Sequence, residues 1–253
     1  MESLKKKIEA IMLDQEVSRN MPLAAILSIT SGADEQITRL RQFSYRKSIT
    51  KSHSLPCTVI SIGNIALGGT GKTPMTIYLA EMLKRMDRKV VILSRGYKGG
   101  AEKKGGLVSD GRQLFMTPDQ AGDEPFMMAG LLRDVPIFVG SNRFKNGRTA
   151  MKKFQPDVIL LDDGFQHLQL KRDIDLVLLD HSNPIGNGRL LPRGPLREPV
   201  SALARGDAFI MTRSDRPSNN LPDLLKCQIK QRPVFKTHHI PYICYVSGGK
   251  ANC

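Results

Sequence analysis

The sequence predicts an α/β fold built around a parallel β-sheet. From residue 57 onward, short and nearly continuous runs of valine, isoleucine and leucine recur, and stretches with helical character separate the early runs. Continuous apolar strands of this kind are typical of a parallel sheet that helices cover on both faces. A glycine-rich turn joins the first strand to the first helix at Gly71-Lys72-Thr73, which indicates the same architecture.

Six apolar runs are predicted strands, and two of the segments between them are predicted helices. The strands are expected at Thr58–Ile62, Val90–Leu93, Pro136–Val139, Val158–Leu161, Leu176–Leu179 and Ala208–Met211. The helices are expected at Pro74–Met86 and Glu124–Leu132. A chain of 253 residues can bury one large core or two modest ones.

Residues 1–52 differ in pattern from the remainder, so we expect an N-terminal arm followed by a core over residues 53–253. Apolar residues recur at helical spacing over residues 4–12, and Met21–Ile29 adds an apolar segment. Between residues 39 and 51 the chain then carries basic residues and no acidic one. Such an arm can lie on an anionic bilayer, or it can pack as an amphipathic helix on the body of the protein.

The composition limits the classes of function. Lysine and arginine number 38 against 24 acidic residues, and the resulting net charge of +14 favours an anionic partner such as nucleic acid, nucleotide or an acidic membrane surface. No apolar stretch approaches the roughly 18 residues that cross a bilayer, so an integral membrane protein is not expected. The four cysteines are irregularly spaced and match no metal-binding pattern.

The motif with the most specific chemistry is GNIALGGTGKTP at residues 63–74. A strand runs into a glycine-rich turn, and a helix opens at Lys72 with Pro74 in its first turn, where proline is tolerated. In such a loop, backbone N–H groups surround phosphate oxygens, Lys72 reaches the β- and γ-phosphates, and Thr73 offers its hydroxyl to Mg²⁺. Position 66 holds alanine where the usual pattern has glycine. The predicted phosphate-binding residues are Ala66, Leu67, Gly68, Gly69, Thr70, Gly71, Lys72 and Thr73.

A second pattern, VILLDDGFQH at residues 158–167, places two acids where a strand ends. A carboxylate at the carboxyl end of a strand can hold Mg²⁺ beside bound phosphates. On an ideal strand Asp162 and Asp163 point to opposite faces, so one should take the metal while the other orients the metal or the ligand. Asp180 ends another apolar run in the same way, but the first pattern is favoured because Gln166 and His167 follow it.

Three smaller groups could complete a site. Asp123 lies in GDEP before a predicted helix, where the acids could instead cap the helix. Arg95 and Arg143 each follow a strand, and ligands of open parallel sheets bind outside the carboxyl ends of the strands. Residues 187–199 form a basic loop rich in glycine and proline, long enough to serve as a lid over a bound ligand.

Together these segments resemble the tetraacyldisaccharide 4′-kinase family, the lipid A 4′-kinases of Gram-negative bacteria. The resemblance runs from about residue 20 to the end of the chain and rests on five segments in order. They are GNIALGGTGKTP (63–74), SRGY (94–97), GDEP (122–125), DDGFQH (162–167) and LLPRGPLREP (190–199). The resemblance implies a P-loop NTPase-like core with helices on both faces of its sheet, and an N-terminal helical arm that faces the membrane.

The implied activity is phosphorylation of the 4′-hydroxyl of tetraacyldisaccharide 1-phosphate, with ATP and Mg²⁺, at the cytosolic face of the bacterial inner membrane. The implied partners are this lipid substrate and the anionic membrane surface, and no nucleic acid is expected. The resemblance gives roles in catalysis to Asp123, Lys72 and Arg143; in metal binding to Thr73, Asp162 and Asp163; near the acceptor to Gln166, His167 and Arg95; and in a mobile segment to Arg197 and Glu198.

The family continues into a smaller domain with an Asp-His and a Thr-x-Lys-Asp motif, whereas the present sequence stops at Cys253. The family's catalytic histidine belongs to that domain, and His238 and His239 lie upstream of its place. We therefore expect a truncated kinase core. A second hypothesis is a remnant that binds nucleotide and membrane without efficient transfer. A third, which rests on charge alone, is an ATPase linked to nucleic acid.

Overall fold

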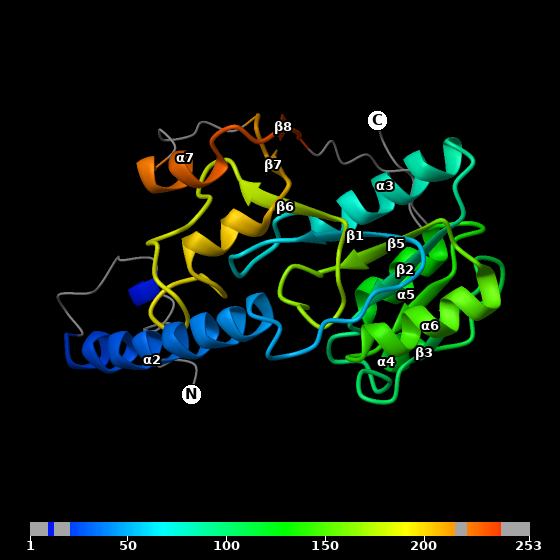
Figure 1. Cartoon of the computed structure of the whole chain (residues 1–253), viewed down its shortest axis with the longest axis horizontal. Helices are drawn as coiled ribbons and strands as arrows, with labels where there is room; N and C mark the ends of the chain where they lie inside the picture. The colour runs from blue at the N-terminus through cyan, green and yellow to red at the C-terminus, as the bar shows by residue number, and fades with distance from the viewer. Residues whose placement is uncertain (1–9, 13–20, 216–221, 239–253) are drawn as a thin grey trace, which may run out of the picture.

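One eight-stranded sheet forms the centre of the computed structural model, which describes residues 10–12, 21–215 and 222–238 (Figure 1). The strand order is β3-β4-β2-β5-β1-β6-β7-β8, and neighbouring strands are parallel except for β3 and β4. The strands are β1 (Thr58–Gly63), β2 (Val90–Ser94), β3 (Gly106–Ser109), β4 (Ile137–Val139), β5 (Val158–Asp162), β6 (Ile174–Asp180), β7 (Ala208–Thr212) and β8 (Val234–Lys236). The predicted parallel α/β sheet is confirmed.

Helices cover both faces of this sheet. They are α2 (Met21–Arg46), α3 (Lys72–Arg85), α4 (Pro118–Ala121), α5 (Asp123–Leu131), α6 (Arg143–Phe154), the 3₁₀ helix η2 (Val200–Arg205) and α7 (Asp223–Ile229). Strand residues alternate between the two faces: Ile92 and Leu160 pack in the cluster with α3 and α5, whereas Leu93 and Ile159 pack with Ala150 of α6. Both faces are therefore buried, which explains the continuous apolar runs.

The six predicted strands and two predicted helices are found within two residues of their expected bounds, whereas β3, β8 and α6 are among the elements that were missed. Strands β3 and β8 are short edge strands, and all three residues of β8 are exposed. In α6 the apolar residues Phe144, Ala150, Met151 and Phe154 pack toward the sheet at helical spacing, but Arg143, Asn146 and Gly147 are buried among them. Polar and small residues on the buried side weaken the apolar pattern from which a helix is predicted.

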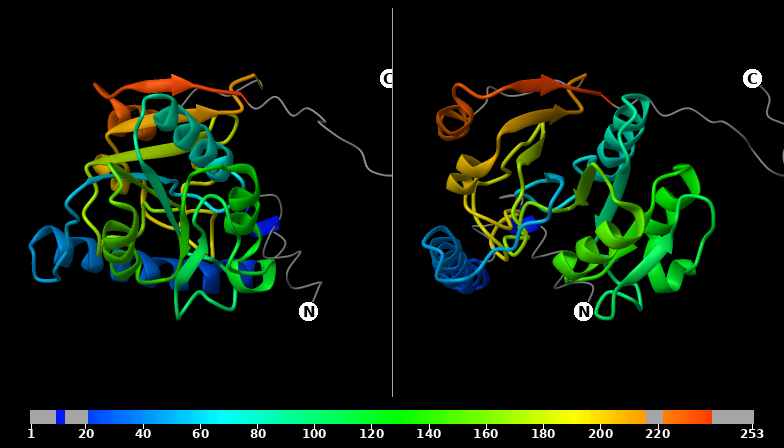
Figure 2. Two further views of the ribbon diagram at one scale, coloured as in Figure 1. Left: turned by 90° about the vertical axis from the view of Figure 1, so that its right-hand side faces the viewer. Right: turned by 45° about the vertical axis from the view of Figure 1, so that its right-hand side comes forward.

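Helix α2 lies beside the segment that follows β6, away from α5 and α6, and Figure 2 shows this from two further directions. Ala24, Leu27 and Ser31 are its buried residues, and Oγ of Ser31 donates to the carbonyl oxygen of Leu190 at 2.8 Å. In the described residues no helix combines the length and the apolar character that a membrane crossing needs. Of the helix predicted over residues 4–12, only residues 10–12 are described, and they are helical.

Candidate active site

The glycine-rich turn between β1 and α3 is braced from within by Asn64. Its Nδ2 donates to the carbonyl oxygen of Ala66 at 2.7 Å and to Oγ1 of Thr70 at 2.9 Å. Gly71 precedes α3 with φ 82°, a left-handed conformation that glycine adopts without strain. Because Gly71 has no side chain to cap the helix, the first backbone N–H groups of α3 remain able to bind an anion.

The first two residues of α3 carry a cation and a hydroxyl next to acidic side chains. Nζ of Lys72 lies 3.3 Å from Oδ1 of Asn64 and 3.7 Å from Oδ1 of Asp163. Oγ1 of Thr73 donates to Oε2 of Glu124 at 3.2 Å. The positive end of the α3 dipole, a lysine, a hydroxyl and carboxylates thus meet at one point, which suits a phosphate with its cation.

Asp162 and Asp163 have different surroundings. Asp162 is buried at the end of β5 and accepts hydrogen bonds from Oγ of Ser94 at 3.1 Å and Oγ1 of Thr76 at 3.3 Å. Burial, together with the charges of Asp163 and Glu124, raises the pKa of Asp162 to about 6. The Asp162 carboxylate is therefore short of positive charge around it.

Asp163 leaves the strand with φ 49° and meets cations instead. Nη1 of Arg197 donates to its two carboxylate oxygens at 3.1 and 2.8 Å, and Lys72 lies 3.7 Å from Oδ1. Burial opposes ionisation of Asp163, but Lys72 and Arg197 outweigh it and hold its pKa below the usual value. Its negative charge is already balanced by these two side chains.

Arg143 and Gln166 fix the backbone around the aspartates. Arg143 opens α6, is buried, and donates through Nη2 to the carbonyl oxygens of Asp162 at 2.9 Å and Asp163 at 3.3 Å. Nε2 of Gln166 donates to the carbonyl oxygen of Asn64 at 2.8 Å. The loop after β5 is therefore bound to α6 and to the phosphate loop.

The segment that was predicted to form a lid packs directly on the phosphate loop. The backbone N–H of Leu67 donates to the carbonyl oxygen of Pro195, and that of Arg197 donates to Ile65, each at 2.7 Å. Arg197 consequently reaches Asp163, whereas the next residue, Glu198, turns into the interior. The carboxylate of Glu198 is buried, so only Arg197 of this predicted pair faces the site.

One open cleft of about 1720 Å³ brings most of the predicted site residues together. They are Leu67, Gly68, Gly69, Thr70, Gly71, Lys72, Thr73, Arg95, Asp123, Arg143, Asp162, Asp163, Gln166, His167 and Arg197. Ala66 and Glu198 do not line this cleft. The cleft lies where the carboxyl ends of β1, β2, β5 and β7 meet, which is the place where open parallel sheets bind their ligands.

Asp123 and Arg95 lie at the exposed border of the cleft. Asp123 begins α5, whose N-cap is Gly122 without a side-chain hydrogen bond, so the interpretation of the GDEP acids as a helix cap is wrong. The side chain of Arg95 is 59% exposed, and its Nε donates to Glu102 at 2.6 Å. Both side chains can therefore meet a ligand that enters from solvent.

The family model described as tetraacyldisaccharide-1-P 4′-kinase matches residues 23–252 of this chain. The chain belongs to this kinase family. Curated relatives named tetraacyldisaccharide 4′-kinase include one from Desulfatibacillum aliphaticivorans, 42% identical over 95% of this chain, and one from Halothermothrix orenii, 42% identical over 92%. The chain spans 64% and 62% of the lengths of these two relatives.

A solved structure of the kinase family shares the architecture. It is the "apo" form of LpxK from Aquifex aeolicus in complex with ATP, with a TM-score of 0.75 and 39% sequence identity. The match covers 85% of this chain and 64% of the Aquifex chain. The resemblance predicted from the five sequence segments is therefore confirmed at the level of the family.

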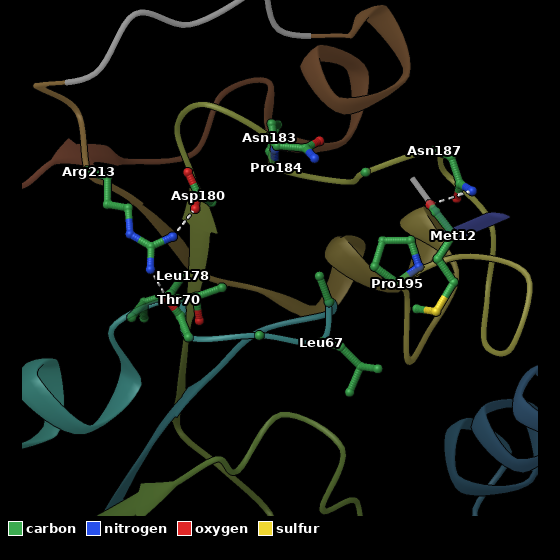
Figure 3. A pocket seen from close by; sticks show the side chains of 14 residues that line it. Met12, Leu67, Thr70, Leu178, Asp180, Asn183, Pro184, Asn187, Pro195 and Arg213 are labelled. Atoms are coloured by element: carbon green, nitrogen blue, oxygen red, sulfur yellow. Dashed lines mark hydrogen bonds and ion pairs between the residues drawn. The ribbon is translucent and has the colours of Figure 1, made fainter. Parts of the chain in front are cut away.

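In this kinase-family chain, a smaller hollow of about 400 Å³ shares residues 67–70 with the cleft (Figure 3). Arg213, which follows β7, points toward Asp180 and binds both its carboxylate and the carbonyl oxygen of Gly69. Asp180, the competing candidate for the metal, is thus engaged by Arg213 at the rim of the hollow. Ala66 lines this hollow as well.

Several residues of the site were not singled out from the kinase-family sequence. Glu124 binds Thr73, and Ser94 and Thr76 bind Asp162, although none of them stood out by spacing. Arg213 also escaped notice, because its contact with the phosphate loop joins residues 144 positions apart. Glu124 lies in GDEP and Ser94 in SRGY, so these two motifs were the available signals for both residues.

His167 lies in the wall of the cleft as a half-buried, neutral imidazole. Its Nε2 has no hydrogen-bond partner within the described part of the chain. Burial and the positive charges of Arg143 and Arg172, then Arg41, lower its pKa from 6.5 to about 3. At pH 7 the ring therefore carries no charge.

Replacing His167 by glutamine is expected to make the fold less sensitive to acid. The unfolded chain takes up a proton near pH 6.5, whereas the folded chain does so only near pH 3, so acid favours unfolding across this window. At pH 4 this uptake of a proton should lower the free energy of unfolding of the unmodified chain by about 3 kcal/mol relative to pH 7, a loss that the glutamine variant lacks. Urea unfolding of the unmodified chain and of His167→Gln at pH 7 and pH 4 measures this loss. An equal loss of stability in the two proteins would contradict the lowered pKa of His167.

Proposed function

We propose that this chain is an enzyme that transfers the γ-phosphoryl group of ATP to the 4′-hydroxyl of tetraacyldisaccharide 1-phosphate, a step of lipid A biosynthesis. The observation that carries the proposal is the meeting of Lys72, Thr73, the two aspartates and Asp123 in one cleft. Membership in the family and the ATP complex of the Aquifex relative support the same reaction.

The residues at the phosphate loop fit ATP and Mg²⁺. Mg²⁺ in such sites is held by one or two carboxylates together with phosphate oxygens and water. Asp162, Asp163 and the hydroxyl of Thr73 supply this oxygen set. Bound Mg²⁺ would neutralise charge on the β- and γ-phosphates.

The protein's part in the transfer is to place groups and to balance charge. We assign Asp123 the role of accepting the proton of the 4′-hydroxyl as its oxygen bonds to the γ-phosphorus. The bond from that phosphorus to the β–γ bridging oxygen then breaks, and ADP leaves. Lys72 and Arg197 supply positive charge for the equatorial and leaving oxygens, while Arg143 holds the backbone of both aspartates.

We assign Gln166, His167 and Arg95 to the acceptor side of the cleft. Nε2 of Gln166 is bound to Asn64, which leaves the side-chain oxygen of Gln166 for a ligand, and the neutral His167 ring lines the same cleft. Arg95 lies at the exposed border, where a phosphorylated head group would enter. A sugar with several hydroxyl groups and a phosphate requires this mixture of neutral and cationic partners.

We also propose that residues 1–52 act as a membrane-facing arm on the core of residues 53–253, at the cytoplasmic face of the inner membrane. Along α2, Ile26, Ile29, Ile37 and Leu40 are each at least 59% exposed. At 100° per residue their spacing places them within one side of the helix. An exposed apolar stripe on a helix whose last third carries arginines is the pattern of a helix that lies in an anionic membrane surface.

Replacing Ile29 and Leu40 together by serine is expected to weaken binding to anionic vesicles by at least about tenfold. Each side chain would lose several buried methylene groups, worth about 0.8 kcal/mol each. Vesicle flotation of the purified chain measures the change, with Leu114→Ser as a control that removes an exposed leucine outside α2. Unchanged flotation of the double variant would place the membrane contact elsewhere.

The proposed activity is tested by phosphoryl transfer in mixed detergent micelles. The purified chain is incubated with Mg²⁺, labelled ATP and tetraacyldisaccharide 1-phosphate, and label is sought in the lipid. Label above that of a Lys72→Ala control is the expected result. Nucleotide binding without any transfer would contradict the proposal and favour the hypothesis of a chain that only binds nucleotide and membrane.

A further inference from the structure

A hydrogen-bonded bridge joins the buried side of α2 to the segment that carries Arg197. Nε2 of Gln42 donates to Oε2 of Glu198 at 3.2 Å, and Nη2 of Arg205 donates to the same oxygen at 2.6 Å. We call Gln42, Glu198 and Arg205 the α2 bridge. It spans 156 residues of sequence between Gln42 and Glu198, so it is a tertiary contact and not a local turn.

The α2 bridge fixes a buried charge. Glu198 is 4% exposed, and burial raises its pKa despite the favourable charge of Arg205. A buried carboxylate is costly unless hydrogen bonds satisfy it, and Gln42 supplies one of them. The position of Glu198 is therefore sensitive to the position of Gln42.

Glu198 is adjacent to Arg197, and the backbone there is bound to the phosphate loop. The N–H of Arg197 donates to Ile65, and its guanidinium holds Asp163, which also lies near Lys72. A movement of Glu198 would therefore move Arg197, whose guanidinium is hydrogen-bonded to the carboxylate of Asp163 in the nucleotide site. If Arg197 released Asp163, the Asp163 carboxylate could bind a cation and Arg197 could bind a phosphate.

The opposite side of α2 carries the exposed stripe of Ile26, Ile29, Ile37 and Leu40. At 100° per residue, Gln42 lies roughly opposite the middle of this stripe. A second contact, from Nη2 of Arg41 to the carbonyl oxygen of Gln166 at 3.3 Å, ties the same turn of α2 to the loop after the aspartates. The helix therefore has one apolar free side and one side bonded to the nucleotide site.

We infer that Gln42 is a positioning residue that couples the contact of α2 with a lipid surface to the nucleotide site, acting through Glu198 on Arg197. The inference rests on the proposed function, because it takes ATP as the ligand of the cleft and a lipid surface as the partner of α2. Coupling between two sites is reciprocal: a surface that strengthens nucleotide binding is itself bound more tightly when nucleotide is present.

The test measures Mg²⁺-dependent binding of a fluorescent ATP analogue to the full chain, with and without vesicles of phosphatidylethanolamine and phosphatidylglycerol. In the unmodified chain, vesicles should tighten binding of the analogue by about fivefold, the lower end of typical coupling. The analogue should strengthen flotation with the vesicles by the same factor. In Gln42→Ala, Arg205 still holds Glu198 in place, so this variant should bind analogue and vesicles separately as before, but should lose both gains.

The matched control is Gln36→Ala, which removes an exposed glutamine from the same helix and should keep both gains. Persistence of the gains in Gln42→Ala would overturn the inference, and so would a loss of vesicle binding itself in that variant. A chain that binds no analogue at all would instead overturn the proposed function together with this inference. Thermal unfolding of both variants reports separately on whether the fold is intact.

Discussion

Replacing Lys72 by alanine is expected to lower ATP-dependent phosphoryl transfer by about 100- to 1,000-fold, the effect of removing one fixed charge-stabilising donor from a transfer site. Nζ of Lys72 lies between Asn64 and Asp163 at the start of α3, where it can meet the β- and γ-phosphates. Without it, the charge that builds up on the transferred group has lost a counter-charge held in place beforehand. Initial rates of label transfer at saturating ATP measure the effect.

The control for this substitution is Lys104→Ala, which removes an exposed lysine from the turn between β2 and β3. It should transfer phosphate at the unmodified rate, because net charge alone does not position the nucleotide. Asp163 keeps Arg197 as a partner in the Lys72 variant, so the local fold should persist. A Lys72 variant that transfers at the unmodified rate would remove the phosphate-loop assignment altogether.

The phosphate loop and the aspartate pair could be predicted because each is local in sequence. Residues 63–74 contain the strand end, the turn and the helix start, and the alternation of a strand already places Asp162 and Asp163 on different sides. The two side chains do differ in their surroundings, since Asp162 meets two hydroxyl groups and Asp163 meets two cations, but strand alternation is not the cause: β5 ends at Asp162, and Asp163 leaves the strand with φ 49°. Local spacing thus identifies the groups that a single strand or turn positions.

The contacts that tie the site together could not be predicted in this way. Gln42 meets Glu198 and Arg213 meets Gly69 only after the sheet has formed, and no spacing in the sequence records either pair. Glu198 shows the limit clearly: the sequence places it beside Arg197 in the same loop, but the fold directs it into the interior. Two residues that are adjacent in sequence, such as Arg197 and Glu198, can lie in the same loop although only one of them lines the site.

Replacing Asp162 by asparagine is expected to raise the Mg²⁺ concentration needed for half-maximal nucleotide binding by at least about tenfold. Even the removal of a group that only hydrogen-bonds a metal ligand weakens metal binding by about this factor, so the removal of a ligand should cost no less. The Asp162 carboxylate has hydroxyl partners and two acidic neighbours, so its raised pKa marks a place where a cation would be favourable. Mg²⁺ titration with a fluorescent ATP analogue at about pH 7.5 measures the shift.

Asp163→Asn is the informative comparison, because Lys72 and Arg197 already balance the charge of Asp163. Its Mg²⁺ titration should move less than that of Asp162→Asn, and a larger shift would assign the metal to Asp163. Loss of the fold cannot account for the Asp162 result. Asparagine keeps one oxygen that can accept a hydrogen bond from Ser94, and its Nδ2 can donate to Oγ1 of Thr76, which still donates to the carbonyl oxygen of Lys72. The substitution also removes a buried charge, so the free energy of unfolding of Asp162→Asn at the same pH should equal or exceed that of the unmodified chain.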